Sequence, residues 1–301
     1  GSLLLAVVDP AHYVQTGYSG IIPGFNVRLH GLAQHANALG PLALLYLVLA
    51  YWVPGKRPWH LLGNLAALAV LILAQSKTAW ISGIFIFLVL LVFRLGKQAD
   101  QELKSAQVGW VTALGGGLFM AMLASSLAFF VTANPLDTLS RLLTADSELT
   151  TLTGRTGIWE ITLETWRRSP WFGYGPALWD LEFRITHHSA LAAWHAHNQF
   201  IQALGERGLF GLAAMLLYVG AMLGYGIRFA AETRGVSLAL VLLLLIRAIT
   251  EIPFKISVLL DVSFLVHLVV FTVLIMLARR AAVPAPARVP TQQAVGSPQA
   301  T

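Results

Sequence analysis

The sequence predicts an all-α fold, a polytopic transmembrane helical bundle with one large polar loop between its helices. Hydrophobic residues make up 56% of the chain and charged residues only 11%, whereas a soluble domain has about 25% charged residues. The mean hydropathy is high, at +0.69. Long apolar runs separated by short polar linkers recur along the chain, and about 20 apolar residues in a row cross a bilayer as a helix.

Composition also excludes several kinds of site. The chain has no cysteine, so neither disulfides nor thiolate metal ligands are available. The net charge of +6 is spread along the chain, which is typical of membrane-orientation signals, so we do not predict nucleic-acid binding. The first apolar run, residues 3–8, is too short to cross a bilayer. We therefore expect further N-terminal spans of a larger protein to precede this chain.

Seven apolar segments are long enough, or nearly long enough, to cross a membrane: 38–54, 58–75, 79–94, 108–131, 208–228, 235–250 and 257–278. These segments divide the chain into membrane helices with an Arg28 segment (1–131), a large loop (132–207), further membrane helices (208–280) and a tail (281–301). The tail is rich in Ala, Pro and Gln, which predicts a disordered cytoplasmic segment.

Basic residues in the short linkers predict the orientation, because such residues favour the cytoplasmic side. Alternation of the spans puts four basic groups on one side: Lys56 and Arg57; Arg94, Lys97 and Lys104; Arg228 and Arg234; Arg279, Arg280 and Arg288. The opposite, outer side then receives residues 9–37, 75–78, the large loop and residues 250–255.

The large loop is where we expect chemistry, since binding and catalytic groups collect on loops held by a rigid scaffold. It contains four of the nine histidines, all between His187 and His197. Residues 155–168 place Trp159, Leu163 and Trp166 on one helical face. This pattern predicts an amphipathic helix suited to a membrane interface, and the Ser-Pro pair that follows ends it.

His197 is the candidate general base. The segment HAHNQFIQALGERGLFG (195–211) predicts a helix that His197 opens, sharing one face with Phe200, Ile201 and Leu204. Histidine ordinarily titrates at about pH 6.5, which makes it the usual general base near neutrality. The alternative is a structural histidine that caps a helix end. His195, two residues away, is expected to point elsewhere on the helix.

A metal site is a weaker interpretation of the same histidines. Zinc takes three or four ligands, and the candidates here are His187, His188, His195 and His197, with Asp180 and Glu182 upstream. No recognised spacing such as H-E-x-x-H occurs, so we predict no metal. There is also no G-x-S-x-G nucleophile elbow and no G-x-x-x-x-G-K-[ST] phosphate loop. We therefore predict neither a serine nucleophile nor the use of ATP.

Charged residues within the spans form a further group: Arg247, Asp261 and His267. A charge inside the membrane costs about 2.5–3.5 kcal/mol on insertion scales, so it normally faces the bundle and finds a partner. Arg247 lies at a depth similar to that of Asp261 and four residues before Glu251. Ion pairing with one of these carboxylates is the simplest prediction, and a substrate contact is the alternative.

Five segments, taken in order, carry a resemblance to a known family: RLHGLAQHANALG (28–40), SKTAW (76–80), TGRTGIWE (153–160), SPWFGYGP (169–176) and HNQFIQALGERGLFG (197–211). With these segments the chain resembles the bacterial O-antigen ligases, within a superfamily that also contains O-antigen polymerases and some oligosaccharyltransferases. The last segment is the most specific, because His-Asn, a following Gln and Glu-x-Gly precede a membrane helix.

The resemblance implies a reaction and its location. A glycan on an undecaprenyl diphosphate carrier is transferred to a sugar hydroxyl of the lipid A–core, without a metal or cofactor and with inversion. The protein is then a multi-pass protein of the bacterial inner membrane, surrounded by membrane lipids, with its large loop and active site facing the periplasm. The partners implied are the undecaprenyl-diphosphate-linked O-antigen and the lipid A–core acceptor.

The resemblance also assigns roles to residues. Arg28 and Arg155 would bind the diphosphate, since arginine meets phosphate with paired, charge-assisted hydrogen bonds, and His197 would be the base. The further substrate contacts are Lys77, Arg247, Trp159 and Trp166, although the tryptophans could equally be interfacial anchors. An O-antigen polymerase or a protein O-oligosaccharyltransferase remains an alternative. A lipid-handling transporter is less favoured, because the chain shows no clear internal repeat.

Overall fold

The computed structural model of the protein describes residues 1–18, 22, 25–33, 35–55, 58–102, 149–187, 194–255 and 261–282. Within these residues the chain is mostly helical, with one small two-stranded sheet, so the predicted helical fold is confirmed. The expected span 108–131, residues 56–57 and 104 of the basic linkers, His188 and the tail beyond residue 282 lie outside the described residues.

Six of the seven expected spans correspond to helices: α3 (Ala36–Trp52), α4 (Pro58–Leu73), α5 (Lys77–Glu102), α10 (Gln199–Arg228), α11 (Val236–Thr250) and α12 (Val262–Ala282). Among the described helices, α5, α10 and α12 are long and apolar enough to cross a membrane, while α3, α4 and α11 are shorter apolar helices. The chain is therefore a membrane protein by helix length and composition.

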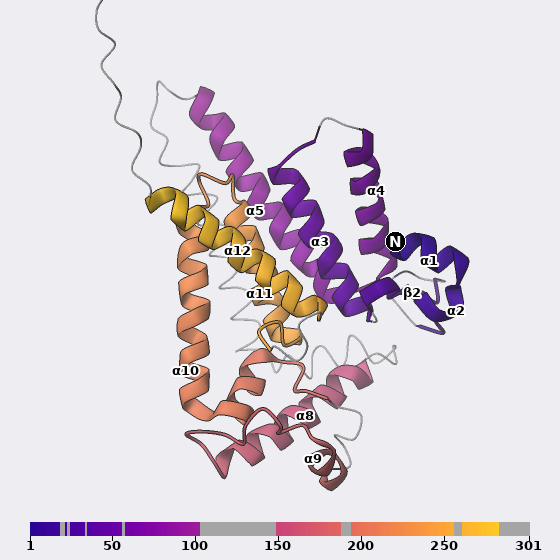
Figure 1. The fold of residues 1–301 in the computed structure, drawn as a ribbon, viewed down its shortest axis with the longest axis vertical. Helices are drawn as coiled ribbons and strands as arrows, with labels where there is room; N and C mark the ends of the chain where they lie inside the picture. The colour runs from indigo at the N-terminus through magenta and orange to yellow at the C-terminus, as the bar shows by residue number, and fades with distance from the viewer. Residues whose placement is uncertain are drawn as a thin grey trace, which may run out of the picture.

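Helix α11 is the centre of the packed core. It contacts α3, α5, α10 and α12, and Leu240, Leu243 and Leu244 are fully buried. Its sequence, VSLALVLLLLIRAIT, is apolar on all sides except near its end, as expected for a helix surrounded by others. Figure 1 shows that α3, α5 and α12 begin at one end of this bundle, the end that we call the polar end.

The N-terminal segment forms a small cap beside the polar end. Helices α1 (Ser2–Val8) and α2 (Pro10–Tyr13) lead into strand β1 (Val14–Thr16), which pairs antiparallel with β2 (Val27–Leu29) in a register that places Gln15 opposite Arg28. A short 3-10 helix, Gly31–Ala33, then leads to α3. The sheet therefore places Arg28 near the start of α3.

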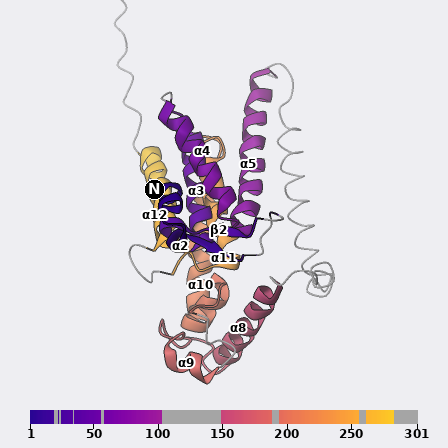
Figure 2. The ribbon, with the colours of Figure 1, turned by 90° about the vertical axis from the view of Figure 1, so that its right-hand side faces the viewer.

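Part of the large loop folds into two helices, α8 (Leu149–Arg167) and α9 (Leu181–Thr186), which lie together beyond the polar end (Figure 2). Helix α8 begins before the expected 155 and ends before the Ser-Pro pair, as predicted. Trp159 packs toward a small core that contains Leu178, Trp179 and Ala196. The tryptophan face of this helix is thus occupied at least in part by the loop itself.

Helix α10 begins later than expected. Its N-cap is Asn198, whose side-chain oxygen accepts from the N–H groups of Phe200 and Ile201, so the prediction that His197 opens the helix is wrong. The expected start of the membrane helix at 208 coincides with a kink, where Gly208 has φ +62°. A Cβ there would lie 2.4 Å from the backbone of Trp171, which explains the requirement for glycine.

Candidate functional site

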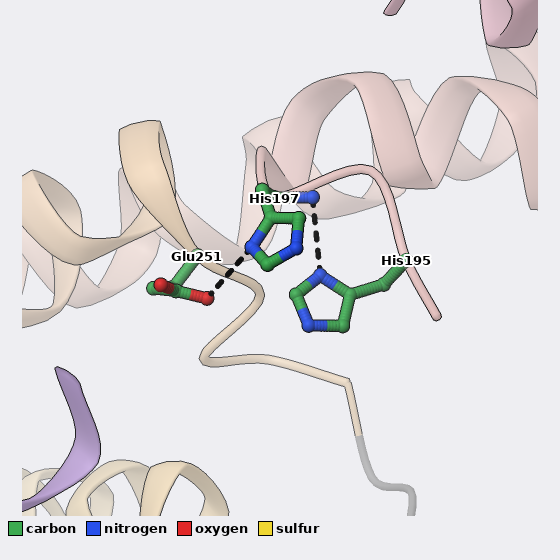
Figure 3. Close-up of side chains that lie close together, drawn as sticks. All are labelled: His195, His197 and Glu251. Carbon is green, nitrogen blue, oxygen red and sulfur yellow. Dashed lines mark hydrogen bonds and ion pairs between the residues drawn. The ribbon is translucent and has the colours of Figure 1, made fainter. Parts of the chain in front are cut away.

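Glu251 is the centre of a cluster of polar side chains at the polar end. It is the C-cap residue of α11, and its side chain is only 14% exposed. Oε1 accepts from Asn37 Nδ2 at 3.1 Å and lies 3.8 Å from Arg155 Nη2. Oε2 lies 3.4 Å from His197 Nδ1 (Figure 3), a close charge contact rather than a well-formed hydrogen bond. Residues from α3, α8, α11 and the loop before α10 therefore meet at one carboxylate.

The groups around Glu251 decide its protonation state. Burial by itself raises the pKa of the carboxyl group, but contact with His197 and the further charges of His195 and Arg155 lower the pKa more, to about 2. The side chain is therefore a carboxylate at neutral pH. A buried carboxylate beside an imidazole can orient the ring and stabilise its protonated form.

The histidine loop, residues 195–197, is held in an unusual backbone conformation. His197 has φ +48°, and its N–H donates to Nδ1 of His195 at 3.1 Å. Ala196 donates its N–H to Gln202 Oε1 at 2.6 Å and accepts from Trp159 Nε1 at 2.7 Å. Because three hydrogen bonds fix these three residues, the loop positions both imidazole rings.

His195 and His197 face each other, contrary to the expectation that they point apart. Their ring centroids are 4.0 Å apart (Figure 3). The expectation assumed helical geometry, and the left-handed backbone of His197 breaks it. Burial, followed by the neighbouring His197, lowers the pKa of His195 to about 4. The His195 ring is consequently neutral at physiological pH.

A second polar network supports the histidine loop from behind. Glu206 Oε1 accepts from Gln202 Nε2 at 2.7 Å and from Lys255 Nζ at 2.6 Å. Gln199 Oε1 accepts from the Phe254 N–H at 2.9 Å. Gln202 joins Glu206 to the histidine loop, and the contacts of Lys255 and Phe254 tie α10 to the chain that follows α11.

Arg28 reaches the cluster through Asn37. Its guanidinium donates from Nε to the Ala74 carbonyl at 2.9 Å and from Nη2 to Asn37 Oδ1, and it stacks over the Tyr18 ring at 4.6 Å. Arg28 is only 8% exposed. Asn37 in turn donates to Glu251, so the side-chain amide of Asn37 links Arg28 to the Glu251 cluster.

Lys77 lies at the same end of the bundle as Arg28. It is the first residue of α5 and is exposed. The next residue, Thr78, has its hydroxyl 3.0 Å from that of Thr250, the last residue of α11. The start of α5 is thereby fixed close to Glu251, which is the residue after Thr250.

Arg247 makes a different contact from the one predicted. It is 1% exposed and donates from Nη2 to Ser263 Oγ at 3.0 Å. Within the described residues, Nε and Nη1 have no hydrogen-bond partner, and the direct ion pair with Asp261 or Glu251 is not formed. Asp261 instead accepts from the Ser263 N–H at 2.6 Å, and Glu251 is engaged by Asn37 and the histidine loop.

The two candidate tryptophans use their indole N–H groups within the loop. Trp159 donates to Ala196, as described above, and Trp166 Nε1 donates to the Pro170 carbonyl at 3.0 Å. Both contacts are structural: one holds the histidine loop, and the other holds the turn after α8. A role in substrate binding for these residues stays a prediction.

A cavity of about 440 Å³ opens beside the cluster. His195, His197, Glu251 and Arg247 line it, together with His35 at the start of α3. Arg155 touches Glu251 but is not part of this lining. The structure therefore brings His197, Arg155, Arg28 and Arg247 to one end of the bundle; His197 and Arg247 line the cavity, whereas Arg155 and Arg28 do not.

Among the described residues, the group whose atoms could hold a metal combines two of the candidate histidines with Glu251. His195, His197 and Glu251 offer ligand atoms that all lie within 4.8 Å of one another. His187, in contrast, places Nδ1 2.9 Å from the Phe183 carbonyl at the end of α9. The trio has two nitrogen ligands and one carboxylate, a set that zinc accepts, so the experiments below include a metal control.

Glu251 is the main residue that the sequence analysis did not assign to the site. It was considered only as a partner for Arg247, because four residues separate them on one helix. The available signal was weak: an acidic residue directly after an apolar helix, followed by Ile-Pro. Its contact with His197 depends on how α10 and α11 pack, which local spacing does not show.

Apolar helices that carry a buried carboxylate, a histidine and arginines at one end define a membrane protein with a candidate catalytic site. The chain belongs to the O-antigen ligase family, whose model matches residues 62–216, about half of the chain. It is also similar to the exopolysaccharide production protein ExoQ of Rhizobium meliloti (strain 1021), with 33% identity over 153 residues. That match covers 44% of this chain and 33% of ExoQ, so the chain spans about a third of this relative's length.

Proposed function

We propose that the protein acts as an O-antigen ligase. It transfers a glycan from an undecaprenyl diphosphate carrier to a sugar hydroxyl of the lipid A–core, at the periplasmic face of the bacterial inner membrane. Membership of the O-antigen ligase family supports a glycan-handling membrane enzyme. The observation that carries the proposal further is the placement of His197, Glu251 and Arg155 within one cluster at the polar end.

His197 serves as the general base. Its Nδ1 faces Glu251, which leaves Nε2 to take the proton from the acceptor hydroxyl. The hydroxyl oxygen then forms a bond to the anomeric carbon while the bond from that carbon to the phosphate oxygen breaks. Because the hydroxyl attacks in one displacement from the face opposite the leaving group, the anomeric configuration inverts. The carboxylate of Glu251 stabilises the imidazolium that results.

Arg155 and Arg28 bind the leaving diphosphate. Negative charge grows on that group as the bond breaks, and preorganised cationic donors stabilise it. Arg155 lies next to the base through Glu251, and Arg28 is joined to the same carboxylate through Asn37. Lys77, exposed at the start of α5, adds a further positive charge at this end. The arginines supply the charge stabilisation that a metal provides in other enzymes, so the reaction needs none.

A polymerase is the second candidate, favoured by one observation. The similar protein ExoQ is named for exopolysaccharide production, and a polymerase would extend a glycan rather than modify lipid A–core. The donor chemistry proposed above is the same for a polymerase, and only the acceptor differs. A protein O-oligosaccharyltransferase would likewise share the donor side.

Purified protein in detergent, mixed with lipid-linked glycan and lipid A–core in the presence of chelator, tests the proposal. We expect a ligated lipid A–core product that depends on His197. Elongation of the lipid-linked glycan instead would identify a polymerase. Loss of product on chelation, with recovery on adding zinc, would contradict the metal-independent mechanism and give the His195, His197 and Glu251 trio a metal-binding role.

A further inference from the structure

Two histidines on the wall of the cavity are held in the same way. Nδ1 of His35 accepts the Asn37 N–H at 3.1 Å, and Nδ1 of His195 accepts the His197 N–H at 3.1 Å. A ring nitrogen that accepts a hydrogen bond carries no proton, so the neutral ring has its proton on Nε2. Both residues line the cavity.

The pKa of each ring is lowered, which favours the same neutral form. Burial is the main cause of a lowered pKa for each: the pKa of His35 lies below its ordinary value, and that of His195 lies at about 4. Each histidine therefore contributes a neutral N–H donor, in a tautomer set by the backbone. Neither contributes a positive charge to the cavity.

The remaining charges decide what kind of ligand fits. Among the described residues that line the cavity, the charged groups are the guanidinium of Arg247 and the carboxylates of Glu251 and Asp261. These residues carry one formal positive charge and two negative ones, a balance that repels a diphosphate. Arg155 and Arg28, which would attract one, lie outside the lining.

Hydroxyl groups match this lining better than phosphates do. A sugar hydroxyl both donates and accepts hydrogen bonds, and the cavity offers neutral N–H donors beside carboxylate acceptors. Its volume of about 440 Å³ falls within the usual range for small-ligand pockets, about 300–1,000 Å³. His197, the base in the mechanism above, also lines the cavity, so a hydroxyl bound here lies next to the group that deprotonates it.

We propose that this cavity is the acceptor subsite, in which His35 and His195 bind hydroxyl groups of the acceptor sugar and present one hydroxyl to His197. The inference rests on the proposed glycan transfer, and it assigns the diphosphate to the opposite side of Glu251, toward Arg155 and Arg28. Acceptor and donor then approach His197 from different directions.

The variants His35→Asn and His195→Asn separate this role from a structural one. The side-chain oxygen of asparagine occupies about the position of Nδ1, so it can still accept the backbone N–H, and asparagine is a favourable N-cap residue at position 35. Neither variant retains a donor at Nε2. A purely structural role therefore predicts unchanged ligand binding, and thermal unfolding of each variant confirms that it is folded.

Two probes, a dephosphorylated core oligosaccharide and inorganic pyrophosphate, are titrated separately into the detergent-solubilised protein without the lipid-linked donor. We expect each variant to bind the oligosaccharide about threefold to tenfold more weakly, as for the loss of one neutral hydrogen bond, with pyrophosphate binding unchanged. Arg155→Lys should show the reverse pattern, weaker pyrophosphate binding with normal oligosaccharide binding.

Weaker pyrophosphate binding in the asparagine variants would overturn the proposal and give the cavity to the diphosphate. Unchanged binding of both probes, or no oligosaccharide binding by the unaltered protein, would also overturn it. If the oligosaccharide result is as expected but no glycan is transferred in the complete assay, the proposed reaction fails while the sugar site stands.

Discussion

Glu251 lies 3.4 Å from Nδ1 of His197, although the whole of α10 and α11 separates the two residues in the chain. The contact joins the end of one buried helix to the residue just before the cap of another. In the proposed mechanism, this carboxylate stabilises the positive charge that the His197 ring acquires during turnover. This pair is the basis of the first two predictions.

Replacing His197 with alanine should abolish detectable glycan transfer. A positioned base contributes about 10²–10⁴-fold to a rate, and a sugar hydroxyl is a weak nucleophile without one. Pyrophosphate binding should be retained, because the arginines hold the diphosphate. Transfer of labelled lipid-linked glycan in detergent measures the first effect. Normal transfer by the alanine variant would remove His197 from the mechanism.

Glu251→Gln should lower kcat while leaving the protein folded. Glutamine keeps the shape of the side chain and an oxygen for Asn37, but it loses the charge that stabilises the imidazolium. We expect about a tenfold to hundredfold loss in kcat, a change of about 1.4–2.7 kcal/mol in the barrier. The pH–rate profile should shift as well, since the histidine loses its carboxylate neighbour. A variant with an unchanged pH–rate profile would limit Glu251 to a structural role.

Stability should fall as the pH is lowered, in two windows. The pKa of His195 is lowered from 6.5 to about 4 in the folded protein, so the unfolded chain binds this proton first and stability is lost between about pH 6.5 and 4. The pKa of Glu251 is lowered from 4.5 to about 2, so its contribution is present above pH 4.5 and is lost below it. Thermal unfolding in detergent across this range measures both. His195→Asn should flatten the upper window and, because the charge of His195 also helps to lower the pKa of Glu251, reduce the lower one.

Arg155→Lys should strongly reduce transfer with normal expression, because lysine keeps the charge and loses the planar fork that binds phosphate. Arg28→Lys should reduce both transfer and stability, since the Arg28 guanidinium also holds Ala74 and Asn37. Comparing transfer rates with melting temperatures separates the two effects. If both lysine variants transfer glycan normally, paired hydrogen bonds to the diphosphate are not required.

Gly208→Ala should destabilise the junction between the loop and the membrane part of α10. The new Cβ would meet the Trp171 backbone at 2.4 Å, and alanine disfavours the φ of +62°. A non-glycine residue in such a conformation costs about 1–3 kcal/mol before any steric clash is counted. Gly220→Ala in the same helix is the matched control, because no atom lies within 4 Å of its Cβ position. Equal melting temperatures for the two variants would contradict the prediction.

The sequence predicted the helical elements well, because apolar runs of membrane length are strong local signals. The sequence also predicted the start of a membrane span at 208, because the polarity of the chain changes there, and the kink in α10 lies at this position. The geometry of the histidine loop was not, because helical spacing was extended to His197, whereas Asn198 caps the helix one residue later. The roles of Glu251 and Asn37 depend on contacts between distant helices, so no local pattern reveals them.

The side-chain amide of Asn37 lies between two groups of opposite charge. Its amide oxygen accepts from a cation, Arg28, and its amide nitrogen donates to an anion, Glu251. The two ends of one amide thus match opposite charges, and aspartate, with nearly the same shape, matches only one of them. An aspartate at this position would place a second carboxylate against Glu251, so the neutral amide is the side chain that satisfies both charged neighbours at once.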